Sequence, residues 1–136
     1  MLNPRAFISF DFDNNLTEKY LFAGQAKNSR TPFNIEDWSS KKHLPQKEWE
    51  DLIEAKINRC NMLIALVGKQ TYSAAGVVKE ISFANANNVP VFGVYIDGAN
   101  IFTPIPDGLY RIRTITWDWA KIADWVSLCM KEKKNR

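Results

Sequence analysis

The sequence predicts a doubly wound α/β fold built on a five-stranded parallel sheet. Short apolar runs alternate with segments of helical periodicity along all 136 residues. Strands that alternate with helices require right-handed parallel crossovers, which bury the sheet between two layers of helices. We expect five such strands to take the flavodoxin-like order 2-1-3-4-5. The length and the absence of repeats or low-complexity linkers predict one domain over 1–136, with its core at about 5–130.

The first strand and helix are predicted from an apolar run that is followed by capping residues. Residues 6–10 form a short buried strand. Residues 11–15 supply short polar side chains, which favour a turn and can satisfy the free amides of a helix start. The helix covers about 16–27. It is expected to place three apolar residues on one face: Leu16, Tyr20 and Ala23.

The second strand and helix have a different pattern. Residues 33–38 alternate apolar and polar side chains, which indicates a half-exposed strand near an edge of the sheet. Pro45 suits the first turn of a helix that runs over about 46–59. The helical spacing predicts that this helix buries four large side chains: Trp49, Leu52, Ile53 and Ile57.

The second half of the chain continues the alternation. Three strands and two helices are predicted: strands at 62–67, at 90–96 and within 110–117, and helices at about 74–88 and 119–131. A long loop with two glycines and two prolines covers 97–109. The last helix is expected to bury five side chains: Trp119, Ile122, Ala123, Val126 and Met130. The basic tail at 131–136 is predicted to be solvated and frayed.

Composition and charge argue against several classes of protein. The net charge of +3, from 18 basic and 15 acidic residues, gives no concentrated basic face for nucleic acid. No stretch approaches the roughly 20 apolar residues that span a bilayer, and the N-terminus lacks the apolar core of a signal peptide. Cys60 and Cys129 lie far apart, and His43 is the one histidine, so we expect no metal site. A reduced, cytoplasmic protein without nucleic-acid or membrane partners fits best.

The predicted topology brings three segments to one crevice at the carboxyl ends of the strands. They are residues 10–14 after the first strand, 38–43 after the second and 68–80 after the third. None contains a phosphate-binding glycine motif. Any phosphate bound there would be held by helix N-termini and by loop side chains.

Glu80 is the candidate catalytic residue, because it lies about two turns into the helix that starts at this crevice. Spacing places it at the margin of a core stripe formed by Val77, Ile81 and Ala84. A partly desolvated carboxylate has a raised pKa, which suits acid–base work or stabilisation of a cation. The alternative is a structural glutamate that pairs with a lysine or caps a neighbour, and spacing alone favours that interpretation.

Asp11 and Asp13 follow the first strand, where phosphoacceptor receivers bind Mg²⁺. The third strand ends in Val67-Gly68 without the acceptor aspartate, so this function is not supported. Turn formation and helix capping are the expected roles of both aspartates. Phe12 and Trp38 are the aromatic residues expected to line the crevice. His43 has no serine or cysteine partner at a recognisable spacing and is expected in a loop.

Four segments together carry a family resemblance: residues 7–13, Trp38-Ser39, 63–68 and 73–84. They resemble the bacterial TIR-like domains, distant relatives of the Toll/interleukin-receptor domain, and among these the TIR protein of Thoeris antiphage defence. The resemblance covers about residues 5–130. It implies a TIR-like form of the flavodoxin-like fold and the consumption of NAD⁺.

The resemblance also implies site roles. Glu80 matches a glutamate of the third helix that supports cleavage of the nicotinamide–ribose bond, with NAD⁺ as substrate and no other cofactor. A carboxylate there stabilises the oxocarbenium-like ribose. Capture of the ADP-ribosyl unit by its own hydroxyl gives a cyclic ADP-ribose isomer, which signals to a separate effector protein. Ser9, Phe10 and Asp11 match the loop that lines the nucleotide pocket, and Ser39 matches the start of the loop that covers it.

The chain departs from the family in one respect. Receptor-type TIR enzymes place a tryptophan shortly before the glutamate, where this chain has Ala75-Gly76-Val77. The aromatic contact to nicotinamide is therefore expected from Phe10, Phe12 or Tyr72. Two other functions stay open: a non-catalytic TIR-like module that works by self-association, and a small nucleotide-binding protein with unrelated chemistry.

Overall fold

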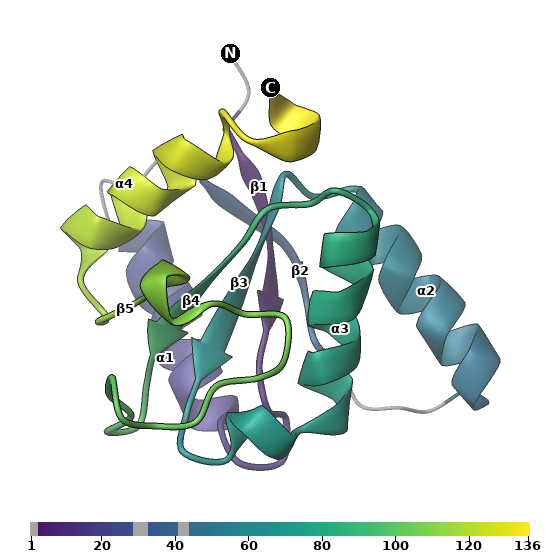
Figure 1. Ribbon diagram of the computed structural model, residues 1–136, viewed down its shortest axis with the longest axis horizontal. Helices are drawn as coiled ribbons and strands as arrows, with labels where there is room; N and C mark the ends of the chain where they lie inside the picture. Colours follow the sequence, from purple (N-terminus) through teal and green to yellow (C-terminus); the bar gives the residue numbers. More distant parts are fainter. Residues whose placement is uncertain (1–2, 29–32, 41–43) are drawn as a thin grey trace.

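Five parallel strands form one sheet in the order β2-β1-β3-β4-β5 in the computed structural model, which describes residues 3–28, 33–40 and 44–136 (Figure 1). The strands are β1 Arg5–Ser9, β2 Asn34–Trp38, β3 Met62–Val67, β4 Val91–Tyr95 and β5 Thr114–Ile115. The predicted fold class and strand order are confirmed. Every neighbouring pair of strands is parallel, as the alternation with helices requires.

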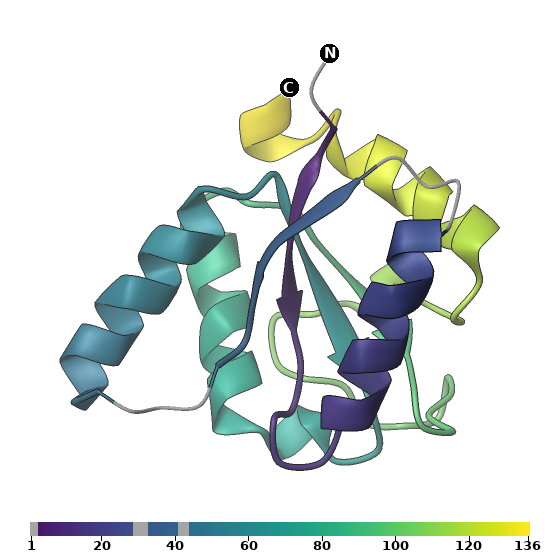
Figure 2. The ribbon, with the colours of Figure 1, turned by 180° about the vertical axis from the view of Figure 1, so that it is seen from behind.

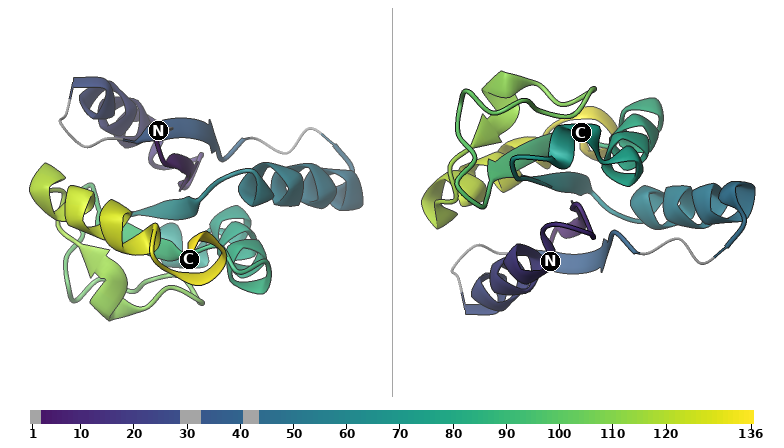
Figure 3. Two further views of the ribbon diagram at one scale, coloured as in Figure 1. Left: turned by 90° about the horizontal axis from the view of Figure 1, so that it is seen from above. Right: turned by 90° about the horizontal axis from the view of Figure 1, so that it is seen from below.

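Helices cover both faces of the sheet, as the two views in Figure 3 show. The helices are α1 Leu16–Asn28, α2 Gln46–Asn58, α3 Ala75–Ala86 and α4 Trp119–Cys129, with short 3-10 turns η1 Thr71–Ser73, η2 Arg111–Arg113 and η3 Lys133–Asn135. Side chains of α2 and α3 pack with one set of strand residues in a first core. Side chains of α1 and α4 pack with the alternate set in a second core.

The central strands β3 and β4 are buried throughout, whereas β2 alternates between exposed and half-buried residues. This confirms the predicted position of the second strand at an edge of the sheet. The register between β1 and β2 shifts by one residue, so that Ala6 pairs with Ile35 and Phe7 with Asp37. The last strand is shorter than the predicted range, because only Thr114 and Ile115 pair with β4.

Three of the predicted helix faces are wrong in part. On α1 the buried residues are Lys19 and Phe22, and Tyr20 is exposed. On α2 Trp49, Ile53 and Ile57 are buried as predicted, but Leu52 is exposed. Each helix touches the sheet along a stripe narrower than its apolar residues, so the residues at the margin of the stripe face solvent. On α4 Ile122 and Val126 are buried as predicted, together with Cys129, but Trp119, Ala123 and Met130 are only half-buried.

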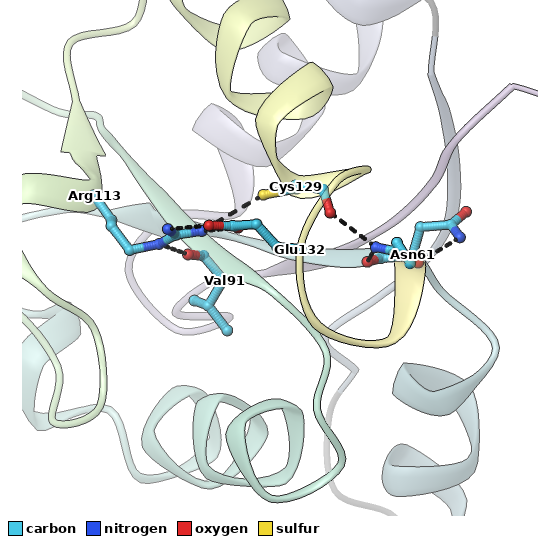
Figure 4. A network of polar contacts seen from close by, with 6 residues as sticks. Asn61, Val91, Arg113, Cys129 and Glu132 are labelled. Atoms are coloured by element: carbon cyan, nitrogen blue, oxygen red, sulfur yellow. Dashed lines mark hydrogen bonds and ion pairs between the residues drawn. The ribbon is translucent and has the colours of Figure 1, made fainter.

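The last six residues are docked on the domain, so the prediction of a frayed tail is wrong. Asn135 Nδ2 donates to the carbonyl oxygens of Asn61 at 2.6 Å and of Cys129 at 3.0 Å. Asn61 Nδ2 donates back to Asn135 Oδ1 at 3.0 Å. Glu132 accepts two hydrogen bonds from the guanidinium of Arg113, at 2.7 and 3.0 Å (Figure 4). Figure 2 shows this segment beside the start of β1, at the end of the sheet where the strands begin.

The opposite end of the sheet, where the strands finish, positions the candidate site. The loops after β1 and β2 and the segment between β3 and α3 meet at that end. Over the ranges that the structure describes, no helix is long and apolar enough to cross a membrane. Both cysteines are buried free thiols, one in each core.

Candidate functional site

A cavity of about 530 Å³ lies at the carboxyl ends of the strands. Its lining comes from residues 10–13, 39–40, 46, 49, 74–77, 79 and 80. The convergence of the three loop segments, predicted from the topology, is therefore confirmed for the residues that the structure describes. The start of α2 forms a fourth wall, which the sequence did not predict. The volume is in the ordinary range for a site that binds a small molecule.

Glu80 lies at the base of this cavity and is 1% exposed. Spacing placed it at the margin of the core stripe of α3, but the structure buries it within that stripe. Val77, Glu80, Ile81 and Ala84 are all buried, at the i, i+3, i+4, i+7 spacing of a core-facing surface. A charged side chain at such a position is rare and requires partners.

Two serine hydroxyls hold one oxygen of the Glu80 carboxylate. Ser9 Oγ donates to Glu80 Oε1 at 2.7 Å, and Ser39 Oγ donates to the same oxygen at 2.6 Å. Ser39 Oγ also accepts the backbone N–H of Phe10 at 3.0 Å. Ser9 ends β1 and Ser39 follows β2, and these strands are neighbours, so the sheet itself brings the two hydroxyls together.

The second carboxylate oxygen, Glu80 Oε2, receives no hydrogen bond from any residue that the structure describes. Glu80 contributes to the wall of the cavity. Because Oε1 is occupied by the serines, Oε2 is the oxygen available to a bound molecule. The arrangement fixes the orientation of the carboxylate before any ligand arrives.

Burial raises the pKa of Glu80 to about 7. The largest cause is the loss of water around the carboxylate, which penalises the charged form. The hydrogen bonds from Ser39 and Ser9 and the charge of Lys56 act in the opposite direction and favour the ionised form. Near neutral pH the group therefore populates both protonation states, as a general acid, a general base or a switchable anion requires.

Asp11 lines the cavity but uses both carboxylate oxygens to build its own turn. Oδ1 accepts the N–H of Asp13 at 3.2 Å, and Oδ2 accepts Asn14 Nδ2 at 2.7 Å. The turn leads into Asn15, whose carbonyl accepts the N–H of Lys19 at the start of α1. The turn expected of this segment is therefore confirmed. The Asp11 carboxylate bonds within the turn and not to the amides of α1, so the structure does not bear out the helix-capping role expected of it. These bonds do not prevent Asp11 from contacting a ligand.

The loop after β3 packs directly against this turn at Gly68. Thr71 Oγ1 accepts the Gly68 N–H at 2.8 Å and lies 3.4 Å from Asn15 Oδ1. A Cβ added at Gly68 would lie only 2.7 Å from Asn15 Oδ1. A side chain at Gly68 would therefore displace the amide of Asn15, which lies between the two loops.

Phe10 and Phe12 form an aromatic wall of the cavity. Their rings stack with centroids 5.6 Å apart and an interplanar angle of 30°. Trp38, which was expected in the crevice, lies instead under Lys19, whose Nζ is 3.8 Å from the ring centroid. Tyr72 is half-exposed and does not belong to the cavity lining. Of the predicted aromatic residues, Phe10 and Phe12 are thus the ones that the fold places at the site.

Two lining residues on α2 were missed from the sequence. Trp49 was assigned only to the core, but it also lines the cavity, and Gln46 does so too. Trp49 fits the apolar stripe of α2, so its pattern gave no sign of a second role. The one signal in the sequence was Glu80 itself. An acidic residue close to the apolar stripe of α3 indicates that polar groups from neighbouring elements face it.

No group of three or more histidine, cysteine or acidic residues that could hold an ion occurs in the part of the chain that the structure describes. His43, expected in a loop, lies outside the described residues.

Comparison with known proteins gives two findings. The family model described as Thoeris protein ThsB, TIR-like domain, matches residues 7–101. Among solved structures, one described as a prokaryotic SEFIR domain is similar with a TM-score of 0.52 and 13% identity, over 94% of this chain and 90% of that chain. No curated protein sequence matches the chain. At 13% identity, the structural likeness supports the fold.

Proposed function

Because the chain belongs to the family of the Thoeris protein ThsB, TIR-like domain, we propose that it consumes NAD⁺ and makes a cyclic ADP-ribose-type signal for antiphage defence. The observation that carries this proposal is the Glu80 carboxylate, buried at the base of the cavity with one oxygen held by two serines and the other available. NAD⁺ is the substrate, and no further cofactor takes part.

In the proposed reaction, the bond between ribose C1′ and the nicotinamide nitrogen breaks. The bonding electron pair leaves with nicotinamide, and positive charge develops on the ribosyl C1′ and ring oxygen. Glu80 Oε2 stabilises that charge from a fixed position, or accepts hydrogen bonds from the ribose hydroxyls when the substrate binds. A preorganised anion in a site with little water is worth far more to a developing cation than the same anion in bulk water.

The ADP-ribosyl cation is then captured by an oxygen nucleophile that loses its proton. Capture by water gives ADP-ribose, and capture by a hydroxyl of the same molecule gives a cyclic isomer. Phe12 is half-buried and stacks on the buried Phe10, so it supplies an apolar face that suits stacking of the nicotinamide ring. The cyclic product would be recognised by a separate effector protein.

The test is release of nicotinamide from NAD⁺ by the purified protein, followed by chromatography. Glu80→Gln preserves the shape of the side chain and removes its charge, so we expect turnover to fall by about 10²-fold or more. Glu48→Gln, an exposed change on α2, is the control and should retain full activity. The assay is repeated at high protein concentration and with infected-cell extract, which cover activation by assembly or by infection. Equal turnover in both variants, or none by the wild type under all three conditions, contradicts the proposal.

A second candidate function is a non-catalytic TIR-like module that self-associates. It is favoured by exposed apolar side chains between β4 and β5: Ile101, Phe102, Tyr110 and Ile112. Phe102 and Ile112 are each 85% exposed. Arg111 Nη1 donates to the Asn100 carbonyl oxygen at 3.5 Å, which links the segment around Phe102 to the segment around Ile112. Contiguous exposed apolar groups are typical of interaction surfaces.

Sedimentation of the wild type over a range of concentrations tests this second function. Phe102→Ser with Ile112→Ser should abolish assembly, while Leu21→Ser, an exposed apolar residue on α1, should not. Assembly without NAD⁺ turnover would favour the module over the enzyme.

A further inference from the structure

The first turn of α3 presents bare backbone amides to the cavity. Its N-cap residue, Ala74, has no side chain that can accept a hydrogen bond. The N–H groups of Ala75, Gly76 and Val77 find no acceptor among the residues that the structure describes, and the first intrahelical bond there runs from Val78 N to the Ala74 oxygen. All four residues of 74–77 line the cavity. Free amides at a helix start, aligned with the helix dipole, favour an anion.

Gly76 keeps this turn open. A Cβ added at Gly76 would meet no atom within 4 Å, so packing does not demand glycine there. Alanine is the better helix former at an unconstrained position. The glycine therefore leaves the backbone of the turn accessible from the cavity, which is the use of glycine where a ligand approaches the main chain closely.

Trp49 is an independent second observation on the same cavity. The side chain is 6% exposed and lines the cavity from α2, and its indole N–H has no hydrogen-bond partner in the described part of the chain. A buried donor without an acceptor is uncommon and calls for a partner that is absent from the free protein. Trp49 thus adds another unused donor to those of the α3 turn.

Both signs of charge line the cavity. Asp11, Asp13 and Glu80 contribute carboxylates. Lys79 contributes an ammonium, with Glu50 3.8 Å away as its ion-pair partner. The unused groups of the α3 turn and of Trp49, namely the backbone amides and the indole N–H, are all donors. A ligand that fits has a cationic or hydroxyl-bearing part at Glu80 and an anionic part at the α3 turn.

We propose that the first turn of α3, with Trp49 and Lys79, is a diphosphate subsite that fixes the direction in which a dinucleotide enters the cavity. The identity of the dinucleotide rests on the proposed function. The preference of this turn for an anion is argued only from its unused hydrogen-bond donors. It places the diphosphate about one helical turn from Glu80, so that the ribose attached to it reaches Oε2.

The test measures binding by calorimetry of three probes: inorganic pyrophosphate, ADP-ribose and nicotinamide riboside, which lacks a phosphate. Gly76→Asp puts a carboxylate into the proposed subsite, and an acid in a first helical turn is favourable for folding. We expect it to weaken pyrophosphate and ADP-ribose binding by about tenfold or more while leaving nicotinamide riboside unchanged. Gly24→Asp is the matched control, because Gly24 is also helical with open space around it.

Trp49→Phe provides a second variant that keeps the ring and removes the N–H. Trp117→Phe is its control, since Trp117 has the other buried indole N–H that lacks a partner in the described residues and lies in the second core. Trp49→Phe should weaken pyrophosphate binding about threefold to tenfold, and Trp117→Phe should not. Failure of the wild type to bind pyrophosphate, or equal binding by Gly76→Asp and Gly24→Asp, overturns the subsite. Failure of the proposed function is detected by a separate measurement, the NAD⁺ assay, in which Glu80→Gln would then turn over NAD⁺ as fast as the wild type.

Discussion

Ser39 and Glu80, 41 residues apart in the sequence, are joined by a 2.6 Å hydrogen bond from Ser39 Oγ to Glu80 Oε1. The same hydroxyl accepts the Phe10 N–H, and the Ser39 N–H donates to the carbonyl oxygen of Ile8 at 2.9 Å. Ser39 therefore ties β1, β2 and α3 together at one point. The hydrogen bond that orients the candidate catalytic acid is also part of the fold.

Removal of the serine hydroxyls should shift the pH dependence of activity. Both hydrogen bonds favour the ionised carboxylate, so Ser9→Ala and Ser39→Ala each raise the pKa of Glu80 further above its usual range. If the anion is the active form, the rising limb of the profile, near pH 7 in the wild type, moves to higher pH in both variants. Ser82→Ala, on the exposed face of α3, should leave the profile in place. A profile that stays fixed in both site variants would show that the serines do not act through Glu80.

Ser39→Ala should also destabilise the protein more than Ser9→Ala. The change leaves the buried N–H of Phe10 without its acceptor, which costs about 1–3 kcal/mol. Ser9→Ala removes a donor and leaves no backbone group unpaired. Urea unfolding of the two variants at one pH measures the difference. Equal free energies of unfolding would mean that the Phe10 N–H finds another acceptor.

Glu80 should make the protein less stable as the pH rises. Its pKa is about 7 in the folded protein and 4.5 as the reference value, so between these values the folded state holds a proton that the unfolded state releases. Raising the pH through this window favours unfolding, by about 3 kcal/mol in all. Glu80→Gln carries no such proton and should be more stable than the wild type above pH 7. Unfolding free energies at pH 5 and pH 8 check the sign, with Glu48→Gln following the wild type at both.

The aromatic wall should affect substrate binding more than the chemical step. Phe12→Leu keeps an apolar side chain but loses the stacking surface, so we expect KM for NAD⁺ to rise about threefold to tenfold with little change in kcat. Tyr72→Leu is the comparison, because that residue was expected at the site and lies outside the lining. Steady-state kinetics of the two variants show which residue contacts the substrate. A larger rise in KM for Tyr72→Leu than for Phe12→Leu would mean that the nicotinamide binds away from Phe12.

The sheet order was predictable from the sequence because it depends on local patterns, namely strands that alternate with helices. The position of Glu80 at the cavity followed from the same topology. Its full burial did not, since the two hydroxyls that make burial possible come from residues 41 and 71 positions away. Those partners meet only through the pairing of β1 with β2 and β3, whose register no local pattern specifies.

The buried face of α1 and the docked tail escaped prediction for related reasons. Lys19 is buried because its ammonium lies over the rings of Tyr20 and Trp38, contacts that a periodicity of apolar residues does not register. The tail looked like a run of charges, and it is held through the amide of Asn135 and the carboxylate of Glu132. In both cases polar side chains make contacts that the hydrophobic pattern of the sequence does not predict.

The C-terminal segment should therefore contribute to stability although it lies at the end of the sheet opposite the site. Asn135→Ala removes the donor to two carbonyl oxygens and the acceptor for Asn61 Nδ2, and we expect it to lower the free energy of unfolding by about 1–3 kcal/mol. Lys131→Ala, an exposed change in the same segment, should have almost no effect. Denaturant titration of both variants measures the difference.

Glu132→Gln tests the same segment through its ion pair. The carboxylate accepts two hydrogen bonds from Arg113, and the pair is only partly exposed, at 20% for the arginine side chain and 27% for the glutamate. Arg113 Nε also donates to the Val91 carbonyl oxygen at 2.7 Å, at the start of β4, so the pair fastens the tail to a central strand. We expect a loss of about 1–2 kcal/mol, with NAD⁺ turnover unchanged at temperatures where the variant stays folded. If turnover falls in step with stability while the protein remains folded, the tail and the Glu80 site are coupled through β4.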